Sequence, residues 1–520
     1  MGFMLKKPAD AVGSAAPAIM IGLFVAFGGI LYGYDTGTIS GIIAMKYWRN
    51  MFSTGYINPS DDYPDITSAQ SSMIVSLLSA GTFFGALAAA PVADSLGRRL
   101  AMIVNSIVFC FGVILQVAST SIPLFVAGRF FSGFGVGLLS ATIPLYQSET
   151  APKWIRGTIV GSYQLAITIG LLLASIVNNA TKDRNDTGCY RIPIAVQFLW
   201  AIILVAGMLV LPETPRFLIK QGKHEAAAAA LARLRRMSVD DPALVDELLE
   251  IRANHEYEMS QGQASFLDIV RGSMGKRLAT GCAIQALQQL SGVNFIFYYG
   301  TTFFQNAGIS NSFLITLITN IVNVVSTFPG LYLVEKWGRR PLLLFGAIGM
   351  CVSQLIVAIV GMTATSNVAN SVLIAFVCIY IFFFASSWGP SAWVVTGELF
   401  PLNARAKCLS ITTATNWLFN WAIAYATPYM VDSGAGDANL QSKVFFIWGG
   451  FCLVAIVFVY TCIYETKGLS LEQVDELYQK VSCAWRSPGF VPSAEQSDIS
   501  ELDAIKVEGT KREAQHVESA

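Results

Sequence analysis

The chain has 520 residues, of which 54% are hydrophobic and 13% charged, and its mean hydropathy is +0.54. A soluble protein needs a larger share of charged residues to cover its water-facing surface. The composition therefore excludes an ordinary soluble protein and predicts one embedded in a lipid bilayer. The 34 basic and 34 acidic residues balance to a formal net charge of zero, so nothing indicates a nucleic-acid partner.

Long apolar runs recur between Pro17 and Tyr464. Each can cross about 30 Å of hydrocarbon as a helix, which satisfies its own backbone hydrogen bonds in lipid. The sequence therefore predicts an all-α membrane protein with about twelve transmembrane helices. We expect the spans near residues 18–45, 69–91, 101–118, 122–145, 158–180, 192–211, 278–304, 312–334, 341–362, 371–396, 407–430 and 443–464.

Lysine and arginine gather in the loops that follow the even-numbered spans. Loops rich in these residues stay on the cytoplasmic side, which predicts that both termini are cytoplasmic. Residues 1–10 lack the apolar core and cleavage site of a removable signal, so we expect the first span to be retained. Asn179 and Asn185 begin glycosylation sequons after the fifth span, on the opposite side, and Asn179 is the weaker candidate because it lies close to the membrane.

The two halves of the chain repeat each other. An acidic residue followed by Gly-Arg-Arg occurs at residues 94–99 and again at 335–340, and a glutamate seven residues before an arginine occurs in both halves. This repeat predicts two pseudo-symmetric six-helix bundles with a substrate site between them, near the middle of the membrane. The expected parts are an N-terminal segment 1–17, a first bundle 18–211, a linker of short cytoplasmic helices 212–277, a second bundle 278–464, and a mostly disordered cytoplasmic tail 465–520 with one helix at 471–480.

Further motifs accompany these loops: Gly33 to Gly37, Gly128-Arg129, Pro144 to Gly157, Pro212 to Arg216, Gln288 to Asn294, and Glu465 to Gly468. Together they resemble the sugar porters of the major facilitator superfamily, especially fungal hexose transporters. Ala90 and Tyr464 depart from the family pattern. The resemblance implies an alternating-access transporter of glucose or a similar monosaccharide, functional as a monomer in the plasma membrane, with sugar:proton symport. A facilitative hexose uniporter and a non-transporting sugar sensor are the alternatives.

A sugar site needs groups that both donate and accept hydrogen bonds, set against an aromatic or apolar wall. Few amides lie inside the expected spans, and the resemblance assigns sugar contacts to most of them. Gln289 and Asn294 would be about 140° apart on a straight helix, so facing one cavity requires a bend near Ser291-Gly292. The alternative is that the amides only join helices. The expected sugar contacts are Gln164, Gln288, Gln289, Asn294, Asn323 and Asn416, with Trp393 as the aromatic wall.

Asp35 places a carboxylate inside the first span. An ionised carboxylate there costs about 3 kcal/mol or more, so it should be neutral or paired, and Arg129 in the fourth span is the expected partner. The resemblance makes Asp35 the protonation site of a symporter, in which proton binding frees it from Arg129 and raises sugar affinity by linkage. The alternative is a permanent structural ion pair.

Charged residues of the repeated motifs fall at the cytoplasmic ends of the helices. The resemblance makes them a gate that holds the outward-facing state shut on the inside through pairs across and within the halves. Their alternative role is to set topology by positive charge. The expected gate residues are Asp94, Arg98, Glu149, Arg156, Glu335, Arg339, Glu398 and Arg405.

An enzyme is not expected. The three histidines, His224, His255 and His516, lie in the central linker and the tail, so neither a metal site nor an activated nucleophile is predicted. The coupled proton is therefore the only cofactor-like partner we expect. A sensor of the yeast kind would carry a long cytoplasmic extension, and the short tail here favours a transporter.

Overall fold

A helix forms at every expected span in the computed structural model, which describes residues 14, 16–58, 62–152, 156–261, 269–306, 308, 311–363, 367–400, 402–432, 436–469 and 471–490. The N half, residues 16–210, begins with two helices that together make the first span. Its helices are α1 (Ala16–Ala26), α2 (Gly28–Ile42), α4 (Ser68–Leu96), α5 (Arg98–Ala118), α6 (Ile122–Thr150), α7 (Arg156–Thr181) and α8 (Gly188–Val210).

The C half, residues 272–462, contains two spans that are not single regular α-helices. The seventh span consists of α13 and α14, and the tenth contains the π-helical turn η2 (Phe384–Trp388) between α17 and α18. The helices are α13 (Gly272–Leu290), α14 (Val293–Asn306), α15 (Ser312–Trp337), α16 (Arg339–Thr363), α17 (Asn367–Phe383), α18 (Gly389–Glu398), α19 (Leu402–Val431) and α20 (Val444–Cys462), with the 3-10 turn η3 (Gln441–Lys443) before the last.

Within the described residues, ten helical segments are long and apolar enough to cross a membrane. The other two expected spans are the broken helix α13–α14 and the long helix α19, and both carry amides and hydroxyls along their length. Their polar side chains lower the mean hydropathy of these two segments, so composition alone does not identify them as spans. Polar side chains are tolerated inside a membrane where they face protein, and they are typical of functional positions.

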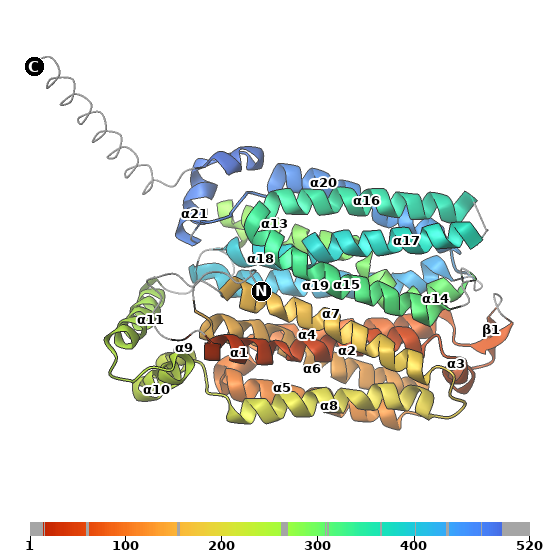
Figure 1. Ribbon diagram of the computed structural model, residues 1–520, viewed down its shortest axis with the longest axis horizontal. Coiled ribbons are helices and arrows are strands. Elements are labelled where there is room, and N and C mark those ends of the chain that lie inside the picture. Colours follow the sequence, from red (N-terminus) through yellow and green to blue (C-terminus); the bar gives the residue numbers. More distant parts are fainter. Residues whose placement is uncertain are drawn as a thin grey trace, which may run out of the picture.

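The two halves lie as two layers of roughly parallel helices (Figure 1). At one end are the short helices α9 (Pro215–Lys220), α10 (His224–Arg235), α11 (Pro242–Gln261) and α21 (Leu471–Lys480); we call it the basic end because Arg98 and Arg339 begin α5 and α16 there. The helix predicted at 471–480 is α21, followed by the 3-10 turn η4 (Ala484–Gly489), whereas the tail beyond residue 490 lies outside the described residues. At the other end, the hairpin end, α3 (Lys46–Phe52) precedes the antiparallel strands β1 (Tyr56–Asn58) and β2 (Tyr63–Asp65).

Glycines let the helices of the N half approach closely. A Cβ added to Gly133 of α6 would lie 2.1 Å from the Leu78 carbonyl oxygen of α4, and one added to Gly81 would lie 2.2 Å from the Phe130 oxygen. Small-residue contacts of this kind are how membrane helices pack where lipid removes the hydrophobic driving force. Between the halves, α4 packs against α19, α7 against α15, and α2 against α14, and these contacts form the seam.

Candidate functional site

A cluster of buried amides lies where α13, α14 and α19 meet. Asn416 Nδ2 donates to Gln285 Oε1 at 2.7 Å and to Gln288 Oε1 at 2.9 Å, and its Oδ1 accepts from Gln289 Nε2 at 2.9 Å. Asn294 of α14 donates to Gln289. Asn416 is therefore the centre of a network that joins helices α13 and α19.

The break between α13 and α14 is what brings Gln289 and Asn294 together. Helix α13 ends at Leu290, and Gly292 has a φ of +85°, a conformation that other residues rarely adopt. A Cβ on Gly292 would also lie 2.5 Å from the Trp448 ring. The predicted bend near Ser291-Gly292 is therefore confirmed, and only glycine fits it without rearrangement.

Gln164 approaches this cluster from the N half. Its Nε2 lies 3.9 Å from the position of a Cβ on Gly389, and the Gly389 carbonyl oxygen accepts from Gln288 Nε2 at 3.2 Å. Gln288 also donates to the Trp388 carbonyl oxygen at 2.9 Å. An amide from each half thus lies beside Gly389 at the seam.

The hydrogen-bonded cluster and the expected set of sugar contacts do not consist of the same residues. Gln285 was not predicted, although it lies on the same face of α13 as Gln288 and Gln289, and this spacing was a signal that could have found it. Among the described residues the hydrogen-bonded cluster does not include Asn323, which is buried on α15. Trp393 is 38% exposed and lies outside the buried cluster. Buried amides are also more numerous than the sequence analysis expected, since Gln197 and Gln354 are fully enclosed.

Asp35 and Arg129 form the ion pair that the sequence predicted. Arg129 Nη1 lies 2.9 Å from Asp35 Oδ1, and the two side chains are 1% and 0% exposed. Gln197 Nε2 of α8, which was not predicted, donates to the same oxygen at 3.2 Å, and Arg129 Nε donates to the Ile74 carbonyl oxygen. Asp35 Oδ2 and Arg129 Nη2 have no hydrogen-bond partner among the described residues. The ion pair is thus buried, and each side chain has one polar atom without a hydrogen-bond partner among the described residues. Protonation of Asp35 would remove its charge and so weaken its attraction to Arg129.

The expected gate residues form two equivalent clusters at the basic end. In the N half, Arg98 pairs with Glu149 at 3.1 Å and with Asp94 at 3.2 Å. In the C half, Arg339 pairs with Glu398 at 2.6 Å and with Glu335 at 3.3 Å. The described pairs of these two arginines lie within each half. Among the residues that the structure describes, neither Arg98 nor Arg339 forms an expected pair with the other half.

Each cluster contains a further glutamate that the sequence analysis did not assign to the gate. Glu213 accepts from the backbone N–H groups of Arg98 and Arg99, and Glu465 accepts from those of Arg339 and Arg340. Burial raises the pKa of Glu213, while the N–H groups of Thr214, Arg99 and Arg98 oppose this rise. The signal was a second repeat, the Glu-Thr pairs at residues 213–214 and 465–466.

The same repeat extends to hydroxyls and glycines. Thr214 donates to Glu149 and Thr466 donates to Glu398, one bond in each half. Gly97 and Gly338 have φ values of +89° and +96°, and a Cβ on either would lie within 2.6 Å of the glutamate carboxylate. In each half, the loop between two helices therefore packs closely against a glutamate carboxylate that follows the last span of that half. This contact holds the end of one span next to the start of another.

The remaining expected residues are placed less fully. Arg405 donates to the Gly397 carbonyl oxygen near the second cluster, whereas the side chain of Arg156 lies outside the described residues. Asn185 is exposed in the turn between α7 and α8, and Asn179 is half-buried in the last turns of α7.

The family described as Sugar (and other) transporter matches residues 21–478, the greater part of the chain. The chain belongs to the sugar transporters of the major facilitator superfamily. The family is one of transporters and not of enzymes.

Curated relatives of the transporter extend over nearly its whole length. It is 60% identical to the major facilitator-type transporter ecdD of Aspergillus rugulosus, over 97% of this chain and 96% of the relative. It is 55% identical to the probable glucose transporter rco-3 of Neurospora crassa, over 96% and 85%. The high glucose sensor RGT2 of Saccharomyces cerevisiae is 46% identical over 89% of this chain, which spans 61% of that sensor's length.

Solved structures support the same fold. The proton:xylose symporter XylE of E. coli, bound to 6-bromo-6-deoxy-D-glucose, aligns with a TM-score of 0.73 and 26% identity over 89% of this chain and 100% of that one. A partially occluded inward-open conformation of XylE aligns with a TM-score of 0.72. The transporter is a multi-pass membrane protein of this fold.

Between the amide cluster and the hairpin end, the halves of the transporter are joined by side chains across the seam. Ser68 of α4 donates to Asp437, and Ser79 donates to Asn420 Oδ1 at 2.8 Å. Ser72 Oγ donates to the Tyr425 carbonyl oxygen at 2.7 Å. These bonds close the hairpin end, while the described pairs of Arg98 and Arg339 at the basic end stay within each half.

Proposed function

We propose that the transporter carries glucose or a similar hexose by alternating access between its two halves. The observation that carries this proposal is the amide cluster around Asn416, with Gln164 of the opposite half beside Gly389. Amides can bind the hydroxyls of a neutral sugar and release it again, since no fixed charge has to be neutralised. The names of the glucose-transporting relatives and the sugar-bound XylE structure support this substrate class.

Proton symport is the coupling that we propose, with Asp35 as the proton site. Protonation of Asp35 would remove its charge, release Arg129, and let α2 move relative to α6. By linkage, the state that binds sugar more tightly then also binds the proton more tightly. The description of XylE as a proton symporter supports this coupling, and uniport is the alternative.

We further propose that the protein works as a monomer in the plasma membrane with both termini cytoplasmic. In this orientation the basic end faces the cytoplasm, as the distribution of lysine and arginine favours. The structure then corresponds to a state closed on the outside. Opening of the hairpin end would require the cross-seam bonds to break while pairs form across the halves at the basic end.

Uptake tests transport against sensing. Labelled glucose is supplied to yeast cells that lack their own hexose transporters and express this chain, and intracellular label is measured over time. We expect accumulation, accompanied by alkalinisation of an unbuffered medium as protons enter with sugar. Sugar binding without accumulation would support the sensor alternative, which the relationship to the sensor RGT2 favours, and accumulation without alkalinisation would remove the proton from the mechanism.

A further inference from the structure

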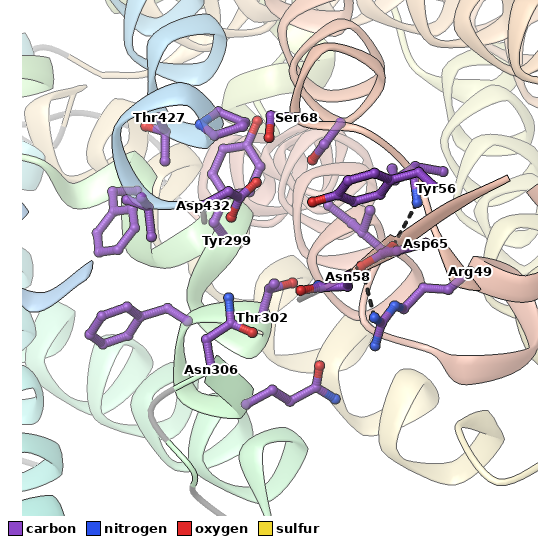
Figure 2. Close-up of a pocket in the computed structure, with 18 residues that line it drawn as sticks. Arg49, Tyr56, Asn58, Asp65, Ser68, Tyr299, Thr302, Asn306, Thr427 and Asp432 are labelled. Carbon is purple, nitrogen blue, oxygen red and sulfur yellow. Dashed lines mark hydrogen bonds and ion pairs between the residues drawn. The ribbon is translucent and has the colours of Figure 1, made fainter. Parts of the chain in front are cut away.

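The hairpin end contains a polar pocket that the proposed transport cycle does not use (Figure 2). The N half lines it with residues of α3, β1, β2 and α4, and the C half lines it with residues of α14 and α19. Its water-accessible volume is about 50 Å³. This is room for a few water molecules. With the basic end facing the cytoplasm, as proposed above, the pocket lies at the outer mouth of the seam.

Carboxylates from both halves meet at this mouth. Asp432 follows the last turn of α19 and lines the pocket, and Asp437 lies in the loop beyond it. Asp65 of the N half is engaged by Arg49, whose Nη2 lies 2.8 Å from Asp65 Oδ2, with side chains 7% and 14% exposed. Ser68 donates to Asp437 Oδ2 across the seam. Within the described part of the chain, no cation forms an ion pair with Asp432.

The titratable and charged groups around Asp432 come from both halves, whereas α4 lines the pocket only with the hydroxyls of Ser68 and Ser71. Among the described residues they are Arg49 of α3, Tyr56 of β1, Asp65 of β2, Tyr299 of α14 and Asp437 of the loop. The three carboxylates and one arginine leave an excess of negative charge when all are ionised. Closing the mouth brings this charge together and removes water from it, and both effects oppose closure.

We propose that Asp432 is a second proton-binding site, outside the membrane core, and that its protonation stabilises the closed hairpin end. The site differs from Asp35 in position and in effect: Asp35 lies inside the N half against Arg129, whereas Asp432 lies at the seam and responds to the solution on the outer side. The proposal rests on the alternating access proposed above, because closure of the mouth is one step of that cycle.

The direction of the pH effect follows from the environment of Asp432. Burial, followed by the neighbouring charges of Asp437 and Asp65, raises the pKa of Asp432 to about 7, against the opposing effect of the Ser68 hydroxyl. In an open, hydrated mouth the carboxyl would return toward an ordinary pKa of about 3.9. The closed state therefore takes up a proton, and it gains stability as the outer pH falls through about 7 toward 4. Between pH 8 and pH 5, this favours closure by up to roughly a hundredfold.

A distance measurement across the mouth tests the proposal without requiring transport. Spin labels are placed at Ile57→Cys of β1 and Lys443→Cys of η3, in full-length protein whose accessible native cysteines are replaced, and the protein is reconstituted in lipid without sugar. Ile57 is 56% exposed and Lys443 is also exposed. We expect the short-distance population to grow as the pH falls from 8 to 5.

Three substitutions assign the effect. Asp432→Asn should give the short distance at every pH, since the amide cannot ionise. Asp437→Asn should keep the pH dependence but move its midpoint to lower pH, because one neighbouring negative charge is gone. This variant also tests the proposal if Asp432→Asn protein fails to fold. Asp186→Asn is the matched control at the same end of the molecule: this side chain is 56% exposed and pairs with Arg184, so the wild-type response should remain.

Two results would overturn the proposal: wild-type protein whose distances ignore pH, or Asp432→Asn protein that keeps the full wild-type pH response. Asp35→Asn separates the two proton sites: it can shift the ratio of open to closed states at every pH, but the pH response that Asp432→Asn removes should remain. Loss of that response in Asp35→Asn would assign the effect to the inner site and refute a second one. If the chain failed to take up glucose, the proposed function would fall while this measurement would still report on the mouth.

Discussion

At the residue scale, Asn416 holds the amide cluster together through both ends of its side chain. It donates to Gln285 and Gln288 and accepts from Gln289, so one residue satisfies three buried amides. Buried polar groups left without partners cost about 1–3 kcal/mol each. This makes Asn416 important both for the shape of the site and for the hydrogen bonds that it offers to a sugar.

Asn416→Ala should weaken sugar binding. The substitution removes the partner of Gln285, Gln288 and Gln289, so these side chains can reorient. We expect the apparent affinity for glucose to fall about tenfold or more, because at least one buried hydrogen bond to the sugar and the network that supports it are lost. Glucose uptake at varied concentration measures this effect. The matched control is Asn105→Ala, a buried amide of α5 that bonds to Thr142 of α6; equal losses in both variants would contradict a special role for Asn416.

Asp35→Asn should uncouple the proton from the sugar. The amide keeps the size of the carboxyl but cannot release a proton, so we expect accumulation against a gradient to be lost while exchange of labelled for unlabelled glucose persists. Arg129 would lose its ion-pair partner, which costs about 3–5 kcal/mol in a buried pair and should also lower thermal stability. Intact accumulation with an unchanged proton movement would show that the pair is purely structural.

At the element scale, the interrupted seventh span positions the cluster. A continuous helix would point Gln289 and Asn294 in different directions, and the break at Gly292 lets them hydrogen-bond to each other. Sequence pattern was sufficient to predict this break, since a glycine lay between two amides that had to share a cavity. The π-helical turn at Phe384–Trp388 was not predicted, because its apolar and small residues are equally compatible with a regular helix.

Gly292→Ala should impair the transporter although it adds only a methyl group. Alanine is strained at a φ of +85°, and its Cβ would meet the Trp448 ring at 2.5 Å, so we expect a loss of stability of about 2 kcal/mol or more and weaker glucose binding. Thermal unfolding and uptake are the measurements. Gly300→Ala in α14 is the control, since a Cβ there would make an ordinary 3.6 Å contact with Ile296. A wild-type melting temperature for Gly292→Ala would refute the argument.

At the scale of the whole molecule, the internal repeat gives the two halves matching clusters at the basic end but different partners at the hairpin end. The arginine, glutamate and threonine contacts occur once in each half. The cross-seam bonds, in contrast, join different residues, such as Ser79 to Asn420 and Ser68 to Asp437. The contacts inside each half are therefore equivalent at the basic end, whereas the bonds that close the hairpin end join residues that the repeat does not relate.

Ser79→Ala should shift the equilibrium toward opening at the hairpin end. It removes a cross-seam hydrogen bond worth about 1 kcal/mol, which corresponds to a change of roughly fivefold in the ratio of open to closed states. The spin-label distance between positions 57 and 443 reports this ratio at fixed pH. Ser106→Ala is the control, because that hydroxyl donates to the Met102 carbonyl oxygen of its own helix. A closed population equal to wild type in Ser79→Ala would show that the bond does not stabilise closure.

The sequence by itself determined the membrane class, the approximate spans, the internal repeat, the break at Gly292 and the partnership of Asp35 with Arg129. These features depend on apolar run length, on repeated motifs and on the cost of burying an unpaired charge, all of which act locally or between a few residue types. Tertiary structure decided that Gln285 joins the cluster, that Trp393 stays outside it, that Glu213 and Glu465 complete the basic-end clusters, and that Asp432 meets Asp65 and Asp437 at the mouth. Apart from Asp432 and Asp437, which are near neighbours in the chain, these placements involve segments far apart in the sequence, and their geometry depends on how whole helices pack, which residue pattern alone does not specify.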